Sequence, residues 1–536
     1  MVQDLKRDHW DIIIVGGGAT GLGAAVDAAS RGYKTLLLEQ SDFAKGTSSR
    51  STKLIHGGLR YLQQGNIGLV TEALRERGLL CDNAPHLVHH LPFLVPLYRW
   101  WEGPFYGIGL KVYDLLAGKL GLEPSRNLTR KQTLQAIPTI ERKGLRGGAL
   151  YYDGQFDDSR LAITLAQTAG DLGATLVNYM HVSSLMKKNK KIDGVRATDI
   201  ETGKHYNLKA KVVINATGIF SDNLRQSDDK KAAKLMEPSQ GIHLVLPVSF
   251  LPNHTAILVP HTDDKRVIFL VPWHGKVLVG TTDIPVDKPS LEPRPLKEEI
   301  DFLLKHAARY LHQAPTKKDI LSIFAGQRPL VRTPGKSTAA ISRDHVITTS
   351  KSGLVTIAGG KWTTYRKMAE DVINKAISVA RLPYRACITT DLQLHGYEKN
   401  ANRTQHWSLY GTDAKAIKKL IRRNKKWGQS ITPGLPYLLA EVVWAARNEM
   451  ARSVEDILAR RTRILFLDAR AAIKAAPLIA KILAKELKKS SAWQTKQIRE
   501  FKRVAKKLPS LNSISSVMVP PNGQKMDGIR ARLIFH

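Results

Sequence analysis

Cysteine is nearly absent from this sequence of 536 residues. Its two cysteines, Cys81 and Cys387, lie far apart and form no CxxC pair. The sequence therefore supports neither a disulfide framework nor a thiolate zinc site. No uninterrupted apolar stretch reaches the roughly 18 residues that a membrane-spanning helix needs. The first residues, MVQDLKRDHW, also lack the apolar core of a secretory signal. We expect a protein of a reducing compartment that does not cross a bilayer.

Acidic residues are few relative to basic ones. The chain has 47 Asp and Glu against 82 Lys and Arg, a net charge of +35. Such an excess of positive charge bears on the binding partners of the protein rather than on its fold. Anionic lipid, nucleic acid and phosphorylated substrates are all compatible with it, and so is a generally basic surface with no specific partner. The length exceeds that of one ordinary core, so two or three globular domains are expected.

Metal-ligand clusters are missing as well. His86, His89 and His90 lie close together in HLVHHLPF, but no carboxylate or cysteine accompanies them. We interpret them as packing or helix-end residues and predict no metal site.

A phosphate-binding turn is the first strong motif. The apolar run 11–15 leads into GGGATG and then into an alanine-rich segment, which predicts a strand, a tight turn and a helix. Gly16, Gly18 and Gly21 fall on the GxGxxG spacing, which brings a pyrophosphate to a helix N-terminus. Glu39 ends a second strand, where its carboxylate can bind a ribose diol and would repel a 2′-phosphate. The motif does not separate NAD from FAD.

The next stretch does separate them. Residues 46–61, GTSSRSTKLIHGGLRY, are rich in small and hydroxylated residues, which let the backbone lie against a flat ring and a pyrophosphate. The sequence here resembles the FAD-dependent glycerol-3-phosphate dehydrogenases, whose signature is this loop. The predicted FAD-binding residues of the loop are Thr47, Ser48, Ser49, Ser51, Lys53, His56, Gly57 and Gly58.

Two later motifs extend the predicted cofactor site. The buried strand 212–215 ends in Ala216, Thr217 and Gly218, and a parallel strand with this ending completes a dinucleotide crevice. The segment 353–366, GLVTIAGGKWTTYR, predicts a strand, paired glycines and another helix, and it adds Gly360, Lys361 and Thr363. The positive end of that helix would face the flavin edge on which negative charge accumulates.

The resemblance, over roughly residues 10–470, implies the fold. We expect an α/β protein, α+β overall, with a Rossmann-like FAD-binding domain, an antiparallel-sheet substrate domain and a C-terminal helical cap. The expected FAD-binding domain is discontinuous, with segments 1–75, 148–225 and 325–385. The substrate domain would comprise 76–147 and 226–324, the cap 390–490, and a loosely packed basic tail 491–536.

The resemblance also implies the reaction and its residues. The family oxidises sn-glycerol 3-phosphate to dihydroxyacetone phosphate by hydride transfer to FAD. Residue by residue, it places Arg60, Tyr61, Arg328, Lys361 and Thr363 at the substrate, with Arg328 also catalytic. His243 is the candidate base, because imidazole accepts protons near neutral pH. A solvated arginine and a core histidine are the ordinary alternatives.

The electron acceptor stays open. Respiratory members pass electrons to quinone, whereas a related oxidase uses oxygen, and amine or amino-acid oxidases share the superfamily. A flavoprotein that binds RNA is a rival of another class, but the bases are not aligned with aromatics, so no specific nucleic acid is expected. Glycerol 3-phosphate, quinone and an anionic membrane surface are the expected partners, and a homodimer is allowed.

One segment suits a membrane surface. Residues 99–121, RWWEGPFYGIGLKVYDLLAGKLG, mix aromatic and apolar side chains with Arg99, Lys111 and Lys119. Such a mixture is typical of a headgroup interface, and equally of an ordinary core helix. Bacterial members of the family are peripheral inner-membrane proteins, so we expect a peripheral protein at the cytoplasmic face of the inner membrane, otherwise cytoplasmic.

Overall fold

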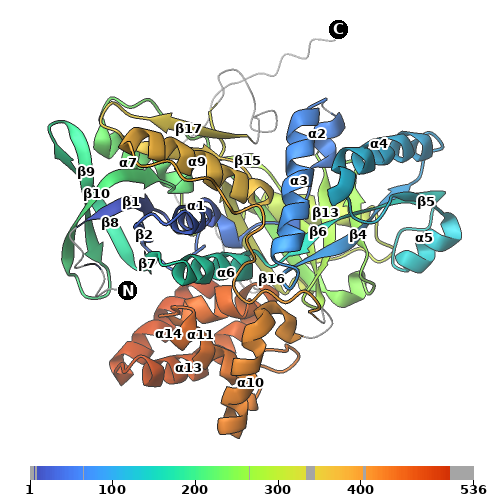
Figure 1. Cartoon of the computed structure of the whole chain (residues 1–536). Helices are drawn as coiled ribbons and strands as arrows, with labels where there is room; N and C mark the ends of the chain where they lie inside the picture. Colours follow the sequence, from blue (N-terminus) through green and yellow to red (C-terminus); the bar gives the residue numbers. More distant parts are fainter. Residues whose placement is uncertain are drawn as a thin grey trace, which may run out of the picture.

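Two large β-sheets and a C-terminal group of helices make up the protein (Figure 1). The computed structural model describes residues 5, 9–63, 65–264, 266–332, 344–401 and 406–506. The predicted fold class, α/β with an antiparallel sheet and a helical cap, is confirmed. We call residues 406–506 the helical cap.

The first sheet has a parallel centre. β1 Trp10–Val15 pairs in parallel with β2 Thr35–Leu38 and with β10 His205–Asn215. Parallel strands are covered on both faces, which agrees with the apolar sequences of β1, β2 and the end of β10, Val212 to Ile214. The other strands of this sheet are β7 Thr175–Val177, β8 Met180–Lys188, β9 Lys191–Asp199, β17 His345–Thr349 and β18 Val355–Gly359.

Successive side chains of β1 enter different cores. Ile12 and Ile14 pack against α1 Ala19–Ser30, α6 Asp158–Asp171 and α9 Tyr365–Ala380. Ile13 and Val15 pack on the other face, against the β8–β9 hairpin and β10. α6 begins where the Asp157 side chain accepts a hydrogen bond from the Arg160 backbone. The short α7 Ser221–Asp228 follows β10.

The second sheet is mainly antiparallel. Its strands run in the order β15, β11, β14, β13, β12, β4, β6, β3, with β16 beside β11 and β5 beside β6. Their bounds are β3 Leu54–Ile55, β4 Val88–Leu97, β5 Arg126–Thr129, β6 Gly147–Phe156, β11 Ser239–Pro247, β12 Ala256–Val259, β13 Ile268–Trp273, β14 Lys276–Gly280, β15 Ile284–Pro285 and β16 Ser322–Arg328. Part of the segment assigned to the FAD-binding domain from residue 148 therefore pairs in this sheet.

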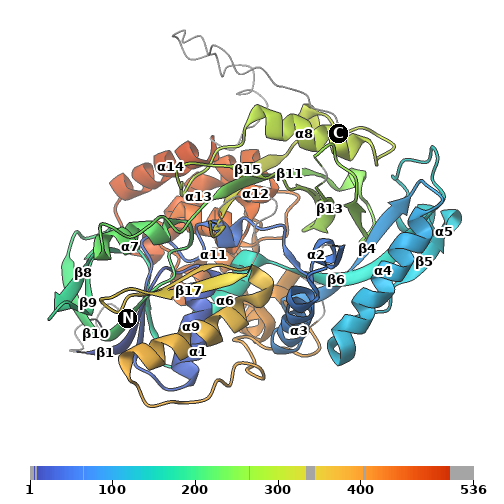
Figure 2. The ribbon, with the colours of Figure 1, turned by 90° about the horizontal axis from the view of Figure 1, so that it is seen from above.

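Helices cover both faces of the second sheet. α8 Lys297–Ala308 lies over β11 and β13 in Figure 2, and α5 Arg130–Ala136 packs on the same core. On the other face, α4 Glu102–Ala117 joins a core that continues into the helical cap. The short α2 Leu59–Gln63 and the longer α3 Ile67–Asn83 lie beside α4.

The segment with interfacial character, α4, has apolar side chains on two sides. Tyr106, Leu110 and Tyr113 are buried, as in a core helix. Ile108 and Leu115 point outward with 69% and 79% of their surface exposed. The buried side agrees with the core-helix interpretation, and the membrane-surface interpretation stays a prediction. Among the helices in the described ranges, none is both long and apolar enough to span a membrane.

The helical cap lies below α6 in Figure 1. Its helices are α10 Ala414–Arg423, α11 Leu439–Asn448, α12 Ile464–Leu467, α13 Ala469–Glu486 and α14 Ser491–Ala505, with a π-helical turn Asp456–Arg461 before α12. The expected loose tail is wrong for residues 491–505, because they form α14, which buries Phe501 and Ala505. The remainder of that predicted tail lies outside the described residues.

Candidate active site

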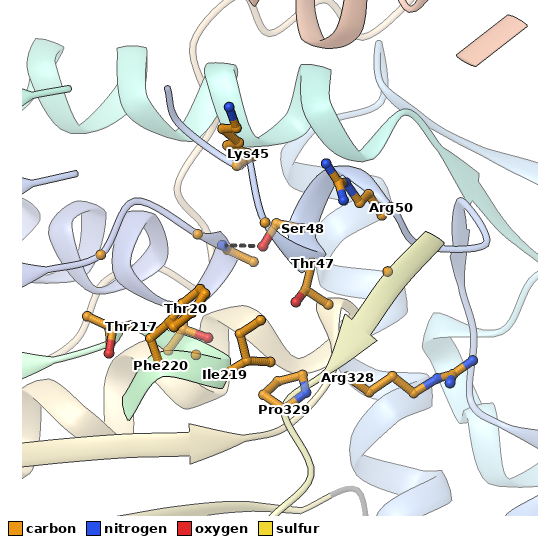
Figure 3. Close-up of a pocket in the computed structure, with 18 of the residues that line it drawn as sticks. Thr20, Lys45, Thr47, Ser48, Arg50, Thr217, Ile219, Phe220, Arg328 and Pro329 are labelled. Carbon is orange, nitrogen blue, oxygen red and sulfur yellow. Dashed lines mark hydrogen bonds between the residues drawn. The ribbon is translucent and has the colours of Figure 1, made fainter. Parts of the chain in front are cut away.

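A cavity of about 700 Å³ lies where the first sheet meets the second. Figure 3 shows side chains from α1, the loop after β2, the turn after β10 and the end of β16 around it. The lining includes fifteen of the residues predicted from the sequence: Gly16, Gly18, Glu39, Thr47, Ser48, Ser51, His56, Ala216, Thr217, Gly218, His243, Arg328, Gly360, Lys361 and Thr363. Segments distant in the sequence thus meet at one site.

The glycine turn leaves no space for side chains. A Cβ on Gly16 would lie 2.5 Å from the Ala216 carbonyl oxygen, and one on Gly21 would lie 1.9 Å from the Gly16 oxygen. Gly16 also has φ of +110°, a conformation open mainly to glycine. Gly18 is the N-cap of α1, whose first turn has no acidic residue. A backbone without Cβ atoms at a helix N-terminus allows a pyrophosphate to approach closely.

Glu39 reaches back to the same turn. Its carboxylate accepts hydrogen bonds from the Gly17 N–H at 2.7 Å and the Ser41 N–H at 2.8 Å. Burial raises the pKa of Glu39, and the two N–H donors oppose that rise. The carboxylate lies on the cavity wall at the end of β2, where the sequence predicted a ribose partner.

Hydroxyl groups tie the loop after β2 to its neighbours. Ser48 Oγ accepts from the Ala19 N–H at 2.9 Å, the dashed contact in Figure 3. Thr47 Oγ1 donates to the Gln327 carbonyl at 2.6 Å, and Ser51 Oγ donates to Asp158 at 2.8 Å. The loop therefore joins α1, β16 and α6 while facing the cavity.

Several predicted residues lie next to the cavity without lining it: Gly21, Ser49, Lys53, Gly57, Gly58 and Tyr61. Lys53 is the clearest case, since its ammonium is fully buried against Asp158 at 2.5 Å and the Ser49 carbonyl at 2.9 Å. Burial is the main cause that lowers the pKa of Lys53 to about 7. Gly57 donates its N–H to the Tyr113 hydroxyl. Arg60 belongs to α2, but its side chain lies outside the described part of the structure.

His243 lies on β11 with 3% of its surface exposed. Its Nε2 is 2.9 Å from Thr52 Oγ1, and its ring stacks on Phe324 with centroids 4.9 Å apart. A Cβ on Gly280 would meet the ring at 2.2 Å. Burial, with the positive charges of Lys53 and Arg328, lowers the pKa of His243 well below 6.5. The imidazole is therefore neutral at neutral pH, and its ring is fixed in place.

Arg328 ends β16 and is held by four contacts. Its Nη2 donates to the Thr282 carbonyl at 2.8 Å and to Thr281 Oγ1 at 3.0 Å. Its Nη1 lies 3.3 Å from Asp283 and 3.4 Å from Ser239 Oγ. A Cβ on Gly241 would lie 2.4 Å from Nη2, so the strand passes close to the guanidinium. This arginine is a fixed cation at the cavity.

Lys361, which lines the cavity, forms a cation–π pair with Tyr61. The Lys361 ammonium lies 4.0 Å from the centre of the Tyr61 ring. Thr363 Oγ1 accepts from the His56 N–H at 3.2 Å. Thr363 belongs to a short helical turn, Trp362–Thr364, that leads into α9, as the sequence predicted. Burial and the nearby Lys361 charge lower the pKa of His56 to about 3, so this imidazole is neutral.

The polar lining residues that the sequence analysis missed include Lys45, Arg50, Thr52 and Thr281. Arg50 donates to Glu292 at 2.7 Å and to the Ala325 carbonyl at 3.2 Å. Thr52 is the hydrogen-bond partner of His243. Lys45, Arg50 and Thr52 lie in or just before the signature loop, so their position was the only available signal.

Comparisons with known proteins agree with this geometry. A family model described as FAD dependent oxidoreductase matches residues 11–366, and one described as the C-terminal domain of alpha-glycerophosphate oxidase matches residues 355–494. The chain is 42% identical to a mitochondrial glycerol-3-phosphate dehydrogenase of Homo sapiens over 90% of this chain and 71% of that one. A second mitochondrial enzyme of this name, from Arabidopsis thaliana, is also 42% identical, over 94% and 87%.

A solved structure is similar over nearly its whole length. It is a glycerol-3-phosphate dehydrogenase from Bacillus halodurans complexed with FAD, with a TM-score of 0.78 and 30% identity. The alignment covers 95% of this chain and 96% of that one.

Proposed function

Since this chain belongs to the FAD-dependent glycerol-3-phosphate dehydrogenases, we propose that its cavity is where sn-glycerol 3-phosphate is oxidised, with His243 and Arg328 as catalytic residues. The reaction of the family yields dihydroxyacetone phosphate. One observation carries the proposal: a glycine cradle for a dinucleotide and a cluster of fixed cations with a neutral histidine line one cavity.

FAD is the cofactor of the family, and the residues present fit it. The cradle formed by Gly16, Gly18 and Ala216 would hold the pyrophosphate, and Glu39 would hold the ribose. Bound FAD supplies the acceptor for a hydride. The turn Trp362–Thr364 and the start of α9 present a helix N-terminus to the cavity, which favours negative charge there.

The substrate phosphate is bound by the cations. Arg328 presents a planar fork that matches phosphate oxygens, and Lys361 adds a point charge held over Tyr61. Thr363 places a hydroxyl on the same wall. Arg60 is assigned to this group from its sequence motif alone. Fixed cations hold the carbinol carbon in one geometry, which lowers the entropic part of the barrier.

His243 accepts the proton of the substrate hydroxyl. Its low pKa keeps the imidazole unprotonated, so a nitrogen lone pair is available. Nε2 is the atom that faces Thr52, and a substrate hydroxyl would replace or share that contact. The nearby Arg328 stabilises developing negative charge on the substrate oxygen.

We propose quinone as the electron acceptor and a peripheral position at the cytoplasmic face of the inner membrane. The outward side of α4 supports this, because Phe105, Ile108, Val112 and Leu115 are exposed beside Lys111 and Arg126. Apolar side chains flanked by cations suit an anionic bilayer surface.

The domain division predicted from sequence remains our proposal, with β6 moved to the substrate domain. The first sheet supports a discontinuous FAD-binding domain, since it draws strands from 10–38, 175–215 and 345–359. A homodimer remains a prediction.

The acceptor and the catalytic residues can be tested together. We expect turnover with glycerol 3-phosphate and a soluble quinone to be at least tenfold faster than with air-saturated buffer alone. His243→Asn should lower kcat with FAD retained and KM little changed. Equal rates with oxygen would contradict the dehydrogenase assignment in favour of an oxidase, and an unchanged kcat would remove His243 as the base.

A further inference from the structure

The loop 42–53, which we call the flavin loop, has little regular structure of its own. Its helical part is a single turn, Thr47–Ser49. Ala44 and Lys53 have left-handed φ angles of 60° and 64°. In residues other than glycine, such angles persist only where the surroundings enforce them. Groups outside the loop must therefore hold its shape.

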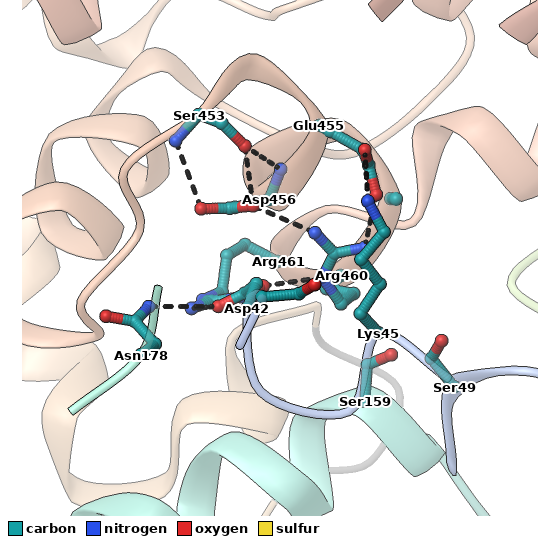
Figure 4. A network of polar contacts seen from close by, with 12 residues as sticks. Asp42, Lys45, Ser49, Ser159, Asn178, Ser453, Glu455, Asp456, Arg460 and Arg461 are labelled. Atoms are coloured by element: carbon teal, nitrogen blue, oxygen red, sulfur yellow. Dashed lines mark hydrogen bonds and ion pairs between the residues drawn. The ribbon is translucent and has the colours of Figure 1, made fainter. Parts of the chain in front are cut away.

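The flavin loop has two sides. Thr47, Ser48 and Thr52 face the cavity. The other side faces the helical cap, whose segment 460–463 has the sequence RRTR. Figure 4 shows Arg460 and Arg461 directed toward Asp42 at the start of the loop, and Glu455 directed toward Lys45.

The first contact is at Asp42, which is fully buried. Arg460 Nε lies 2.5 Å from one carboxylate oxygen, and Arg461 donates to both oxygens at 2.7 and 3.0 Å. Burial raises the pKa of Asp42, but the two guanidinium groups outweigh it and lower the pKa to about 2. These ion pairs therefore persist at every physiological pH.

At the second contact, the loop supplies the cation and the cap supplies the carboxylate. Lys45 donates to Glu455 of the cap at 3.0 Å, and Glu455 also accepts from Arg460 at 2.9 Å. Burial raises the pKa of Glu455, while Lys45 and Arg460 together lower it to about 2. A carboxylate and an ammonium three residues apart thus meet partners of opposite charge, which fixes the register between loop and cap.

The third contact is at Ser49. Its carbonyl accepts from Arg463 Nη2 at 3.1 Å and from Lys53 Nζ at 2.9 Å. Arg463 also donates to Asp158 at 2.9 Å and to Ser159. Asp158 forms ion pairs with both Arg463 and Lys53, so one carboxylate at the start of α6 joins the loop to the cap.

We propose that Arg460, Arg461 and Arg463 of the helical cap are positioning residues for the flavin loop, so that FAD binding and docking of the cap stabilise each other. A buried charge that loses its partner is strongly destabilised, so the fully buried Asp42 favours the docked cap. Coupling between two binding events is reciprocal, so FAD must stabilise the cap as much as the cap stabilises FAD binding. The inference rests on FAD as the cofactor.

Hydrogen exchange on the unaltered full chain tests the coupling directly. We expect added FAD to slow amide exchange in residues 455–467 at least tenfold, while α8, which lies away from the loop, keeps its rate. Equal rates in 455–467 with and without FAD would overturn the proposal. This comparison needs no variant, so it decides even if substitutions fail to fold.

A variant pair isolates Arg463. Arg463→Gln should raise the FAD dissociation constant at least tenfold, measured from the fluorescence of released flavin, and Arg463→Lys should recover part of the loss. Arg452→Gln is the matched control, because Arg452 joins the cap to Glu201 without touching the flavin loop. The FAD dissociation constant of Arg452→Gln should stay within twofold of that of the unaltered chain.

The outcomes separate two kinds of failure. Folded Arg463→Gln protein with FAD affinity within twofold of the unaltered chain would contradict the positioning role. Unaltered protein that binds no FAD would contradict the cofactor assignment instead, because bound flavin is measured directly.

Discussion

Gly21 lies where one added carbon would collide with the backbone. A Cβ there would be 1.9 Å from the Gly16 oxygen, and a backbone atom cannot move aside as a side chain can. Gly21→Ala should therefore cost at least about 2–3 kcal/mol at the cradle. We expect FAD affinity to fall more than about 30-fold. Flavin content after gel filtration measures it.

Gly68→Ala is the control for that substitution. Gly68 lies in α3, and a Cβ there has no neighbour within 4 Å. Its flavin content should equal that of the unaltered chain. Full flavin content in Gly21→Ala would show that the turn is not the cradle.

Arg328 tests the substrate side. Truncating a hydrogen-bonded charge typically costs about 2–5 kcal/mol, so kcat/KM of Arg328→Ala should fall by at least roughly 30-fold. FAD content should stay unchanged, since the Arg328 guanidinium binds Thr281 and Thr282, which lie between β14 and β15 of the second sheet. Arg309→Ala, an exposed arginine paired with Asp263, should keep its activity. Loss of flavin from Arg328→Ala would mean that this arginine serves the cofactor.

The sequence could predict those site residues that lie in short motifs. Gly16, Ser48 and Thr217 were found because a local pattern dictates their contacts. The position of Lys53 behind the flavin loop could not be predicted, because its partner Asp158 is distant in the sequence and its second neighbour, Arg463, comes from the cap. The Thr52–His243 contact joins two segments in the same way.

At the scale of elements, the segment after α9 is attached by a histidine between two carboxylates. His395 lies 2.6 Å from Asp171 of α6 and 2.9 Å from Asp413 before α10. The hydrogen bond to Asp413, more than that to Asp171, raises the pKa of His395 from 6.5 to about 9, against the effect of burial. Because the pKa of His395 is higher in the folded state, the protonated imidazole stabilises that state fully at pH values below its pKa in the unfolded chain. This stabilisation is lost as the pH rises through its pKa in the folded state.

We therefore expect the melting temperature to fall between pH 6.5 and pH 9 more steeply in the unaltered chain than in His395→Gln. After allowance for partial solvent exposure, the contribution is about 1–2 kcal/mol. His254→Gln, at an exposed histidine, should keep the steep dependence. Parallel curves for the unaltered chain and His395→Gln would refute the role of this contact.

The outward side of α4 makes a second prediction at this scale. Leu115 has 79% of its surface exposed, so a charge there should not disturb the core. Leu115→Glu should weaken binding to vesicles of anionic phospholipid several-fold, because it replaces an inserting side chain by a repelled one. Flotation at low salt measures it, with Ile200→Glu, another exposed apolar position, as the control. Equal flotation of the two variants would mean that α4 is not the membrane surface.

At the scale of the whole molecule, the sequence predicted the fold class but not the end of the helical cap. The strongly apolar strands and the glycine turn were enough to predict the parallel centre of the first sheet, because periodicity and turn chemistry are local. The extent of the cap was not predictable. α14 Ser491–Ala505 has a basic sequence that suggests a loose tail, yet it folds because Phe501 and Ala505 meet α13 and the core beneath it.

The net charge of +35 is compatible with a network of buried ion pairs. Within residues 406–506, 23 Lys and Arg stand against eight Asp and Glu. Most of these bases lie on the solvent side, but Arg460, Arg461 and Arg463 are buried against carboxylates of the flavin loop and α6. The cap thus contributes to the FAD-binding region although no cap residue lines the cavity.

Anaerobic addition of glycerol 3-phosphate to the purified yellow protein tests the central claim most directly, because it reads the cofactor and the substrate in one absorbance spectrum. We expect the visible absorbance band of the oxidised flavin to be bleached by about one equivalent of substrate, and glycine or proline to leave it unchanged. A band that persists with glycerol 3-phosphate but is bleached by an amine or amino acid would contradict the assignment.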